Sequence, residues 1–369
     1  MKIKEIKVNE KESKYSIIIG DKSIQLISSK IKKVCPDTKK ICLVVDRNIP
    51  SKFRNILVKQ LKKYDLHVVV LNPNEKLKSF QNVSKLSEKL LSLNFNRSDL
   101  IISFGGGVIG DFSGFVASIL KRGINFINIP STLLAQVDAA IGGKTGVNSK
   151  FGKNLLGSFY LPKIVIIDVS LIKSLSRREL ITGYAEILKH AIIFSKKFYS
   201  WLDKNSNKLL IEKNTNYLQY AIHKSCKIKL FFVGGDLKEK NKRMNLNFGH
   251  TFAHAIESTN NYSSRIKHGE AVLIGMVMAT KLSKMVKITS DKTLQNILSL
   301  YKKYNLNYDL KKYFKKNKYN KIISFMSSDK KNKGQKINFV LLKRIGKTAR
   351  PGNFNYSVKF IKKNFLSLI

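Results

Sequence analysis

The stretch that decides the fold runs from Ser103 to Phe159 and reads SFGGGVIGDFSGF (103–115), KRGINFINIPSTLLAQVDAAIGGKTGVN (121–148) and FGKNLLGSF (151–159). A short apolar strand is followed at once by a glycine turn and by an apolar segment that is able to start a helix. Glycines, charged side chains and amides are mixed here with short apolar runs, a composition that suits a phosphate-rich ligand better than a packed core. The sequence therefore predicts a binding site directly after the strand.

On both sides of this stretch, short β-branched runs alternate with helical patterns. Strands are expected at 16–19, 41–45, 67–71, 100–104, 124–129 and 164–167, with helices at 51–64 and 79–93. Such alternation predicts a parallel, Rossmann-like α/β sheet. After about Ser170 the pattern changes to amphipathic helices at 178–193, 217–232, 248–258, 269–286 and 294–304, followed by a strand or hairpin arm at 337–342. The Lys-rich segment 311–321 is interpreted as a solvated helix or loop.

A chain of 369 residues is longer than a domain with one hydrophobic core usually is, and 43% hydrophobic residues are enough to form two cores. We therefore predict an α/β domain over residues 1–172 and a mostly helical domain over residues 173–369. The longest apolar window, Ala271 to Ala279, is about half of what a membrane span needs, and the N-terminus lacks an apolar signal core. Cys35, Cys42 and Cys226 form no C-x-x-C pair and are interpreted as reduced core residues. A cytoplasmic location is expected.

The formal charge of +45 raises the possibility of a nucleic-acid partner. Of the 69 basic residues, however, 59 are Lys and only 10 are Arg, and they are spread along the whole chain. Nucleic-acid binders favour Arg for bidentate contacts and gather charge on one face. The excess of Lys, Asn and Ile is therefore interpreted as the mark of an AT-rich genome, and no specific nucleic-acid partner is expected.

The glycine turn carries a nucleotide-binding pattern. Gly105, Gly107 and Gly110 satisfy G-x-G-x-x-G directly after the strand, where backbone N–H groups and a helix N-terminus hold a pyrophosphate. The same fingerprint asks for an acidic residue about 20 positions later, and the next strand ends in Pro130 without one. An ordinary Rossmann domain is therefore disfavoured. Asp46, at the end of an earlier strand, is an alternative ribose ligand, although it also fits an ordinary turn after a strand.

Three of the six histidines, His250, His254 and His268, fall within 19 residues. His250 and His254 are four residues apart and project from one helix face. The zinc peptidase motif needs Glu after the first His, and Thr251 stands there, so peptidase chemistry is not expected. With Glu186 as a third ligand from an earlier helix, two imidazoles and a carboxylate leave a coordination position open for a substrate, as in catalytic zinc sites.

These residues resemble those of the 3-dehydroquinate synthases of the shikimate pathway, over nearly the whole chain. The resemblance is carried by GGGVIGDFSGF, KRG, PSTLLAQVDAAIGGKTGVN, GKNLLGSF, the segment REL-x-x-GYAE-x-x-K, RMNLNFGHTFAHAIE and HGEAV. It implies a homodimer with an NAD-binding N-terminal domain, a helical metal- and substrate-binding domain and a divalent metal, usually zinc, with cobalt as the other candidate.

The resemblance also implies site residues. The metal ligands are Glu186, His250 and His268, and NAD is bound by Asp46, Asn48, Glu75, Lys78, Gly105, Gly106, Gly107, Asp111, Ser131, Thr132, Ser174 and Glu179. The catalytic group is Lys144, Lys189, His254, Asn154 and Arg122, with Arg122 reaching the neighbouring subunit's site. The substrate is further held by Asp138, Lys153, Lys229, Arg243, Asn247 and Lys347. On pattern alone, Lys189 and Lys229 read as solvated helical lysines, and only the resemblance gives them a role.

The implied substrate is 3-deoxy-D-arabino-heptulosonate 7-phosphate. The implied reaction comprises transient oxidation by NAD, β-elimination of phosphate, return of the hydride and intramolecular aldol closure. The basic residues suit a phosphate dianion and a carboxylate, and His254 suits proton handling because imidazole titrates near neutral pH. The alternatives are a related sugar-phosphate cyclase and a metal-dependent polyol or glycerol dehydrogenase. The segment from Phe231 to Leu237 departs from the family by placing Phe231, Phe232 and Leu237 where charges are common.

Overall fold

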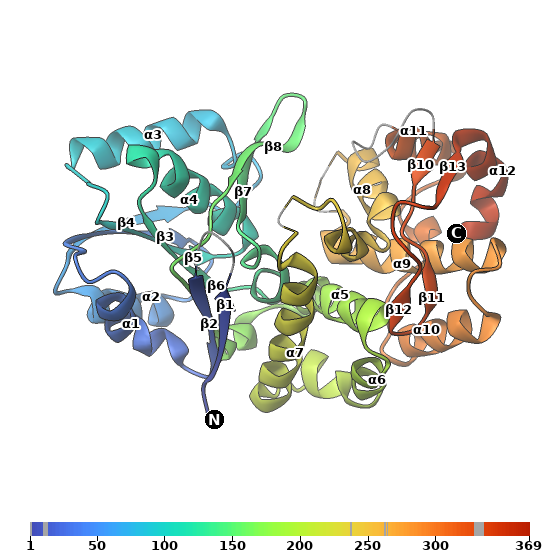
Figure 1. The fold of residues 1–369 in the computed structure, drawn as a ribbon, viewed down its shortest axis with the longest axis horizontal. Coiled ribbons are helices and arrows are strands. Elements are labelled where there is room, and N and C mark those ends of the chain that lie inside the picture. Colours follow the sequence, from blue (N-terminus) through green and yellow to red (C-terminus); the bar gives the residue numbers. More distant parts are fainter. Residues whose placement is uncertain (1, 10–13, 237, 262, 264, 328–335) are drawn as a thin grey trace. The chain divides into compact units, whose positions relative to one another are not determined.

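The computed structural model describes residues 2–9, 14–236, 238–261, 263, 265–327 and 336–369 (Figure 1). The chain divides into two compact units. The first unit comprises Met1–Leu180 and Lys213–Leu230, and the second comprises Ile181–Glu212 and Phe231–Ile369. Helices α5 (Arg177–Phe194) and α7 (Thr215–Val233) therefore contain residues of both units. The domain bounds expected at 172 and 173 stay a prediction.

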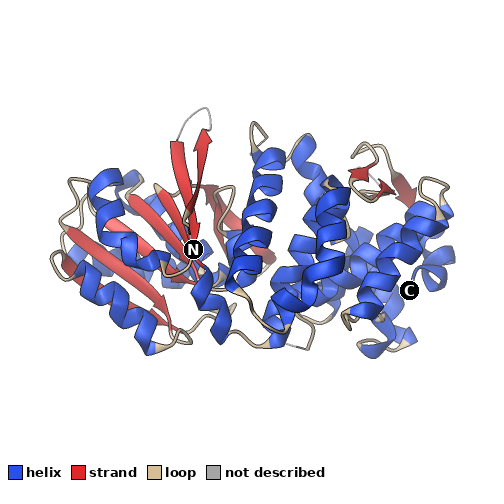
Figure 2. Ribbon diagram, turned by 90° about the horizontal axis from the view of Figure 1, so that it is seen from below, coloured by secondary structure: helices blue, strands red, loops and turns tan. Residues whose placement is uncertain are grey.

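The first unit is built around one seven-stranded sheet with the order β1-β2-β9-β6-β5-β3-β4. Six of its strands run parallel, namely β2 (Lys14–Gly20), β9 (Ile164–Asp168), β6 (Asn125–Pro130), β5 (Leu100–Gly105), β3 (Lys40–Asp46) and β4 (Asp65–Leu71). These are the six strands expected from the sequence, so the parallel α/β prediction is confirmed. Strands β5 and β9 are buried along their whole length because helices cover both faces of the sheet (Figure 2).

Two apolar cores lie on opposite faces of this sheet. One face packs on α1 (Ile27–Val34) and α2 (Ser51–Leu61), and the other packs on α3 (Phe80–Ser92) and α4 (Gly107–Ile119). The two faces use alternate residues of the same strands, since Leu43 and Val45 enter the first core while Cys42 and Val44 enter the second. Helix α3 begins where Ser79 accepts a hydrogen bond from the Asn82 backbone N–H, as expected of a serine N-cap.

Three strands of the first unit were not expected from the sequence. Strand β1 (Lys4–Asn9) pairs antiparallel with β2 at the edge of the sheet, and β7 (Lys144–Ser149) pairs with β8 (Gly152–Phe159) in a separate hairpin (Figure 1). In that hairpin Gly146 faces Gly157. A Cβ on Gly146 would lie 2.6 Å from the Leu156 carbonyl oxygen, and a Cβ on Gly157 would lie 2.3 Å from the Thr145 carbonyl oxygen. Glycine is therefore required on both sides, which explains part of the glycine enrichment in this stretch.

The second unit is mainly helical. It contains part of α5 and the helices α6 (Lys196–Leu210), α8 (His250–Thr259), α9 (His268–Met285), α10 (Asp291–Lys303), α11 (Tyr319–Ser327) and α12 (Val358–Leu368). Helix α9 is its central element, since most of its residues are buried. Helices α8 and α9 pack closely where Gly249 and Gly275 meet, because a Cβ on Gly275 would lie 2.2 Å from the Gly249 carbonyl oxygen. The prediction of a helical second half is confirmed.

The expected strand at 337–342 is divided between two small sheets. Strand β10 (Lys336–Asn338) pairs with β13 (Asn355–Ser357), and β11 (Leu342–Arg344) pairs with β12 (Lys347–Thr348). The segment 311–321 forms short 3₁₀ turns at Leu310–Lys312 and Lys316–Lys318 before α11, in keeping with the expected solvated helix or loop. Within the part of the chain that the structure describes, no helix is long and apolar enough to cross a membrane.

Candidate active site

A cavity of about 370 Å³ lies in the first unit, at the carboxyl ends of the strands. It is lined by Asp46, Asn48, Ile49, Pro50, Pro73, Gly106, Gly107, Val108, Ser131, Thr132, Leu171, Ser174, Leu175 and Glu179. The carboxyl end of a parallel sheet is where α/β proteins bind ligands, and the volume lies in the usual range for small-molecule sites. Eight of the twelve residues expected to bind NAD line this cavity. The four that do not are Gly105, Glu75, Lys78 and Asp111.

The glycine turn forms one wall of the cavity. Gly106 is the N-cap of α4 and has no side chain to cap the first N–H groups of that helix, a position at which proteins bind anions. A Cβ on Gly106 would lie 3.3 Å from Thr132 Cγ2, and one on Gly107 would lie 3.3 Å from Ala139 Cβ. Larger residues would therefore crowd the turn, which explains the glycines at these positions.

Asp46 lies beside the turn, at the end of β3, which pairs with β5. Its carboxylate accepts a hydrogen bond from the Asn48 backbone N–H at 2.8 Å, as a turn-forming aspartate does, and its side chain is buried. Burial raises the pKa of the Asp46 carboxyl, and the negative charge of Glu179 adds to that shift, while N–H groups of Asn48 and Gly106 oppose it. The two interpretations of Asp46, as a turn former and as a cavity residue, are therefore compatible.

A second polar cluster in the first unit joins residues expected to contact NAD with residues expected to contact substrate. Lys78 Nζ lies 2.5 Å from both Asp111 Oδ2 and Asn154 Oδ1. Lys153 Nζ lies 2.8 Å from Glu75 Oε1. Although burial raises it, the net pKa of Glu75 is lowered by the hydrogen bonds from Lys153 and Asn148. The hairpin β7–β8 thus brings Lys153 and Asn154 to the loop that follows β4.

The remaining substrate residues of the first unit lie near the π-helical turn Ala135–Ala139 and the hairpin. Lys229 Nζ lies 2.6 Å from Asp138 Oδ1 and 2.5 Å from the Asp138 carbonyl oxygen. Lys229 is 6% exposed, so it is not the solvated helical lysine that its pattern indicated. Lys144 is exposed and lines a small pocket that Asp111 also lines. Arg122 is exposed and adopts φ 62°, in the left-handed region.

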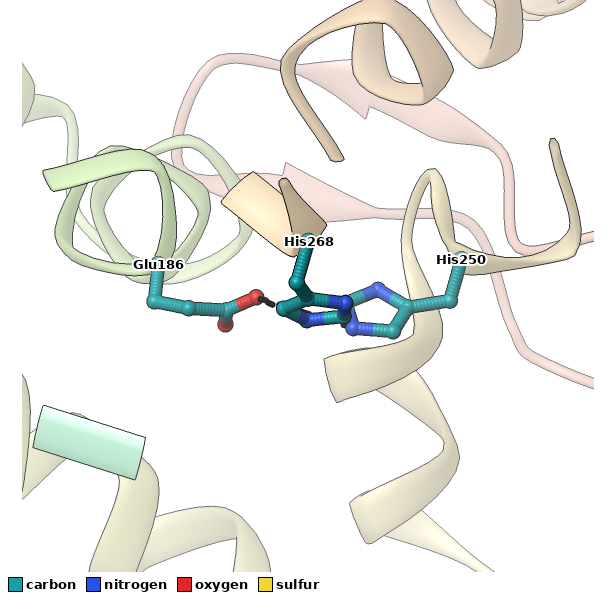
Figure 3. Close-up of side chains that lie close together, drawn as sticks. All are labelled: Glu186, His250 and His268. Carbon is teal, nitrogen blue, oxygen red and sulfur yellow. Dashed lines mark ion pairs between the residues drawn. The ribbon is translucent and has the colours of Figure 1, made fainter. Parts of the chain in front are cut away.

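The three residues expected to bind a metal come together in the second unit (Figure 3). Nε2 of His250 and Nε2 of His268 each lie 3.6 Å from Glu186 Oε1, and one ligand atom from each of the three residues lies within 4.8 Å of the others. They come from three helices, since Glu186 lies on α5 and the two histidines are the first residues of α8 and α9.

This donor set fits a catalytic zinc ion. Zinc bonds to histidine nitrogen and carboxylate oxygen are about 2.0–2.2 Å long, so a tetrahedral ion holds its ligand atoms about 3.3 Å apart. The 3.6 Å gaps need only a small contraction. Although burial lowers it, the pKa of His268 is raised overall to about 10 by the carboxylates of Glu257 and Glu186. A metal that binds there must displace a proton, so its affinity falls as the pH falls.

Lys189 and His254 adjoin these three residues. Lys189, one turn along α5, forms an ion pair with Glu186 Oε2, and the side chains of Lys189 and Glu186 are 2% and 0% exposed. The Lys189 ammonium therefore contacts Oε2 of Glu186, and the other oxygen, Oε1, faces the imidazoles of His250 and His268. The rings of His250 and His254 meet edge to face, with centroids 5.3 Å apart. Lys189 is thus buried rather than solvated, and its charge is balanced within the site.

Arg243 and Asn247 lie on the short 3₁₀ helix Lys242–Asn247, just before α8. The loop ahead of it is held by Asp236, whose carboxylate accepts N–H bonds from Lys240, Asn241 and Arg243 at 2.9 Å each. Lys347 is exposed on β12, and the next residue, Thr348, donates a hydrogen bond to Asn245 at 2.5 Å. The small sheet β11–β12 therefore brings Lys347 to the turn that carries Arg243 and Asn247.

The segment that departs from the family is partly explained. Phe232 packs edge to face against both Phe231 and Phe194, and the Phe231 ring lies tilted against Phe194 with centroids 4.8 Å apart. Lys242 Nζ lies 5.0 Å from the Phe231 ring centroid. The aromatic residues thus form a local cluster between the ends of α5 and α7. Leu237 lies outside the described residues.

The sequence did not indicate several residues that line the cavity or contact the site residues of the second unit. Pro50 and Pro73 line the cavity, and their position just beyond β3 and β4 was a usable signal. Glu239 accepts a hydrogen bond from the Asn247 amide, and Glu257 contacts His268. No local pattern distinguishes these two carboxylates from surface glutamates, because only the folded chain places them beside a site residue.

Comparison with solved structures identifies the fold. The structure is similar to 2-deoxy-scyllo-inosose synthase complexed with carbaglucose-6-phosphate, NAD+ and Co2+, with a TM-score of 0.88, 23% identity and coverage of 98% of this chain and 99% of that chain. It is also similar to 2-epi-5-epi-valiolone synthase from Streptomyces hygroscopicus subsp. jinggangensis 5008 with NAD+ and Zn2+ bound, with a TM-score of 0.84, 22% identity and 98% of each chain covered. The fold is therefore the one that these two synthases share.

Sequence comparison identifies the family. Models of the 3-dehydroquinate synthase N-terminal and C-terminal regions match residues 68–182 and 183–332. The 3-dehydroquinate synthase of Pelagibacter ubique (strain HTCC1062) is 46% identical over 360 residues, which is 97% of this chain and 98% of that protein. The chain belongs to the 3-dehydroquinate synthase family.

Proposed function

We propose that this chain is a 3-dehydroquinate synthase, a carbon–oxygen lyase that converts 3-deoxy-D-arabino-heptulosonate 7-phosphate to 3-dehydroquinate and phosphate. The observation that carries this proposal is 46% identity to the Pelagibacter ubique synthase over 97% of the chain. The proposed route is transient oxidation by NAD, β-elimination of phosphate, return of the hydride and intramolecular aldol closure, so that NAD is regenerated in each turnover.

The cavity of the first unit is the proposed NAD site. The N-terminus of α4 with its glycine turn suits the pyrophosphate, and the carboxylate of Asp46 suits ribose hydroxyls. Asn48, Ser131, Thr132, Ser174 and Glu179 supply further polar groups around the cavity. Glu75, Lys78 and Asp111 do not line the cavity. We propose that they also bind NAD, from the polar cluster around Lys78.

In the second unit, Glu186, His250 and His268 are the proposed ligands of a divalent cation, zinc or cobalt. NAD supplies a hydride acceptor and the cation supplies a Lewis acid for the substrate hydroxyls. The proposed donor atoms are Nε2 of His250 and of His268, at the first residues of α8 and α9, and Oε1 of the buried Glu186. Lys189 pairs with the second carboxylate oxygen, Oε2. These assignments give the second unit its proposed role as the metal- and substrate-binding domain and the first unit that of the NAD-binding domain.

The remaining site residues are proposed to bind the charged substrate and to handle its protons. The substrate carries a phosphate and a carboxylate, so the cationic groups of Lys144, Lys153, Lys229, Arg243, Arg122, Lys189 and Lys347 stabilise negative charge during the reaction. Asn154, Asn247 and Asp138 supply hydrogen bonds to hydroxyl groups. His254, beside His250, is placed to move a proton at the substrate.

The proposed function is tested by an assay for phosphate release. Purified protein with zinc, the heptulosonate 7-phosphate and NAD at a small fraction of the substrate concentration is expected to release one phosphate per substrate and to accumulate no NADH. A polyol dehydrogenase would instead require stoichiometric NAD and form NADH, without releasing phosphate. Stoichiometric NADH would therefore overturn the proposal. A different sugar-phosphate cyclase would be revealed by mass and NMR spectra of the carbocyclic product.

Asp46 gives a pH-dependent prediction. Replacement by asparagine is expected to weaken NAD binding roughly 10- to 100-fold, as a charged hydrogen bond contributes about 1.5–3 kcal/mol. Because burial raises the pKa of Asp46, its carboxylate becomes protonated at a higher pH than an ordinary aspartate. The affinity of the unmodified protein for NAD should therefore decline on mild acidification, whereas Asp46→Asn should lack this step. Fluorescence titration with NAD at several pH values measures both effects.

The control for this prediction is Asp37→Asn, which removes an exposed carboxylate of the same unit that does not line the cavity. Asp37→Asn should bind NAD as the unmodified protein does across the whole pH range. An unchanged affinity in Asp46→Asn would exclude a contact between this carboxylate and NAD.

We further propose a cytoplasmic homodimer with a small phosphorylated sugar acid as its substrate and neither a membrane nor a specific nucleic acid as a partner. In this dimer Arg122 serves the neighbouring subunit. Arg122→Ala and His268→Ala should each be inactive. Mixed subunits should regain about a quarter of full activity, because about half of the dimers are hybrids and each hybrid has one complete site. Activity after subunit exchange measures this, and no recovery would place Arg122 in its own subunit's site.

A further inference from the structure

In both histidines of the proposed metal site, the ring nitrogen Nδ1 contacts an oxygen atom of the protein. His268 Nδ1 lies 3.1 Å from Glu257 Oε2, and His250 Nδ1 lies 3.3 Å from the Phe248 carbonyl oxygen. The opposite ring atom, Nε2, of both histidines lies 3.6 Å from Glu186 Oε1. Each ring therefore has an oxygen at Nδ1 and directs Nε2 toward the same carboxylate.

These oxygen contacts determine which nitrogen can bind a cation. A neutral imidazole has one N–H donor and one lone pair, and carbonyl and carboxylate oxygens accept hydrogen bonds. When a cation displaces the proton of Nε2, the Nδ1 atom of each ring keeps its hydrogen toward the oxygen beside it, and the Nε2 lone pair points to the position that Glu186 Oε1 also faces. A carboxylate is a stronger acceptor than a backbone carbonyl, so His268 is held more firmly than His250.

The place of Glu257 in the chain supports a role beyond helix stability. It lies near the C-terminus of α8, where the helix dipole disfavours a negative charge. Its side chain is 14% exposed, so the carboxylate is also partly desolvated. Both effects cost stability, and the hydrogen bond to His268 at the start of α9 offsets them.

From this geometry we infer that Glu257 is a positioning residue for the metal: it fixes the ring orientation and tautomer of His268 and raises the basicity of Nε2. This inference rests on the proposed function of Glu186, His250 and His268 as metal ligands. Carboxylates that accept a hydrogen bond from a metal-bound histidine typically change metal affinity 10- to 100-fold when they are replaced. Glu257 touches neither the cation position nor the substrate in this role, so its effect passes through His268.

The experiment measures zinc affinity by competition with a chromophoric chelator, using full-length protein first stripped of metal. Glu257→Gln keeps an acceptor oxygen without the charge and should raise the zinc dissociation constant about 10-fold. Glu257→Ala removes the acceptor and should raise it toward 100-fold. The visible spectrum of the cobalt-loaded protein should change in Glu257→Ala, because His268 is then free to turn.

The matched control is Glu212→Gln, which removes one carboxylate from an exposed ion pair with Lys208 and should leave zinc affinity unchanged. Unchanged zinc affinity and an unchanged cobalt spectrum in a folded Glu257→Ala protein would overturn the inference. If Glu257→Ala fails to fold, the test relies on the isosteric Glu257→Gln. A zinc affinity of Glu257→Gln equal to that of the unmodified protein would then overturn the inference.

The same titrations separate this inference from the proposed function. If the unmodified protein binds no zinc or cobalt, or if His268→Ala binds it equally well, the proposed metal ligands are wrong. If the unmodified protein binds metal, His268→Ala does not, and both Glu257 variants bind it normally, then only the positioning role of Glu257 is wrong.

Discussion

His268→Ala is expected to purify without zinc and to lose turnover by about 10³-fold or more. The loss of one of three ligands leaves Glu186 and His250, too few for a stable catalytic zinc site. Without the cation, the transition state loses several kcal/mol of charge stabilisation, which corresponds to that factor in rate. Metal analysis and the phosphate-release assay on the same preparation measure both effects. Full turnover in metal-free His268→Ala would refute the ligand assignment.

His223→Ala serves as the matched control for this experiment. His223 lies on α7, and burial together with Lys4, Lys227 and Lys224 lowers its pKa to about 4, so the ring is neutral at neutral pH. It is not one of the proposed metal ligands Glu186, His250 and His268. His223→Ala should keep its zinc and its turnover, so that any loss in His268→Ala is due to the particular imidazole removed.

The second large effect is expected from Lys189→Met. The ion pair between Lys189 and Glu186 is almost fully buried, and removing one partner of such a pair typically costs about 3–5 kcal/mol. The protonated His268 ring, 3.6 Å from Glu186, stays as a weaker partner, so the loss should lie toward the lower end of that range. That loss applies to the metal-free protein. With zinc bound, the cation supplies the compensating charge, so the loss of stability should be much smaller. Urea unfolding in the presence of a chelator and in the presence of excess zinc measures the difference.

The control is Lys208→Met, which breaks an exposed ion pair with Glu212. Such pairs contribute about 0–1 kcal/mol, and zinc should make no difference to this variant. If Lys189→Met loses the same stability with and without zinc, the charge of Glu186 is not shared with a cation, and the role given to this carboxylate is wrong.

The sheet was predictable because its inner strands β3, β5 and β9 are buried on both faces and therefore appear as continuous apolar runs. Strand β1 alternates exposed and buried residues, and its Lys-rich composition hid that period. Helix α6 was missed for a similar reason, since Phe198, Leu202 and Leu209 have helical spacing but lie among Lys, Ser and Asn. In both cases the enrichment in lysine obscured a pattern that tertiary packing makes plain.

The site was predictable in part. His250 and His268 were signalled locally by histidines beside glycine at expected helix starts, whereas Glu186 needed a partner on another helix. Lys189 and Lys229 are indistinguishable in sequence from surface lysines, yet the structure buries both against carboxylates, Glu186 and Asp138. Long-range pairing of this kind has no local pattern, and only the family resemblance indicated it.

The first unit is discontinuous in sequence, and this has a consequence for how the protein is made. Residues 213–230 complete it, and within them Gln219 donates to the carbonyl oxygens of Lys2 and Ile19. A ribosome delivers α5 and α6 before this closing segment, so the contacts of Gln219 with Lys2 and Ile19 form only after residue 219 has emerged. A fragment that stops at residue 182 would lack the segment that completes this unit and is expected to be less stable than the same residues within the full chain.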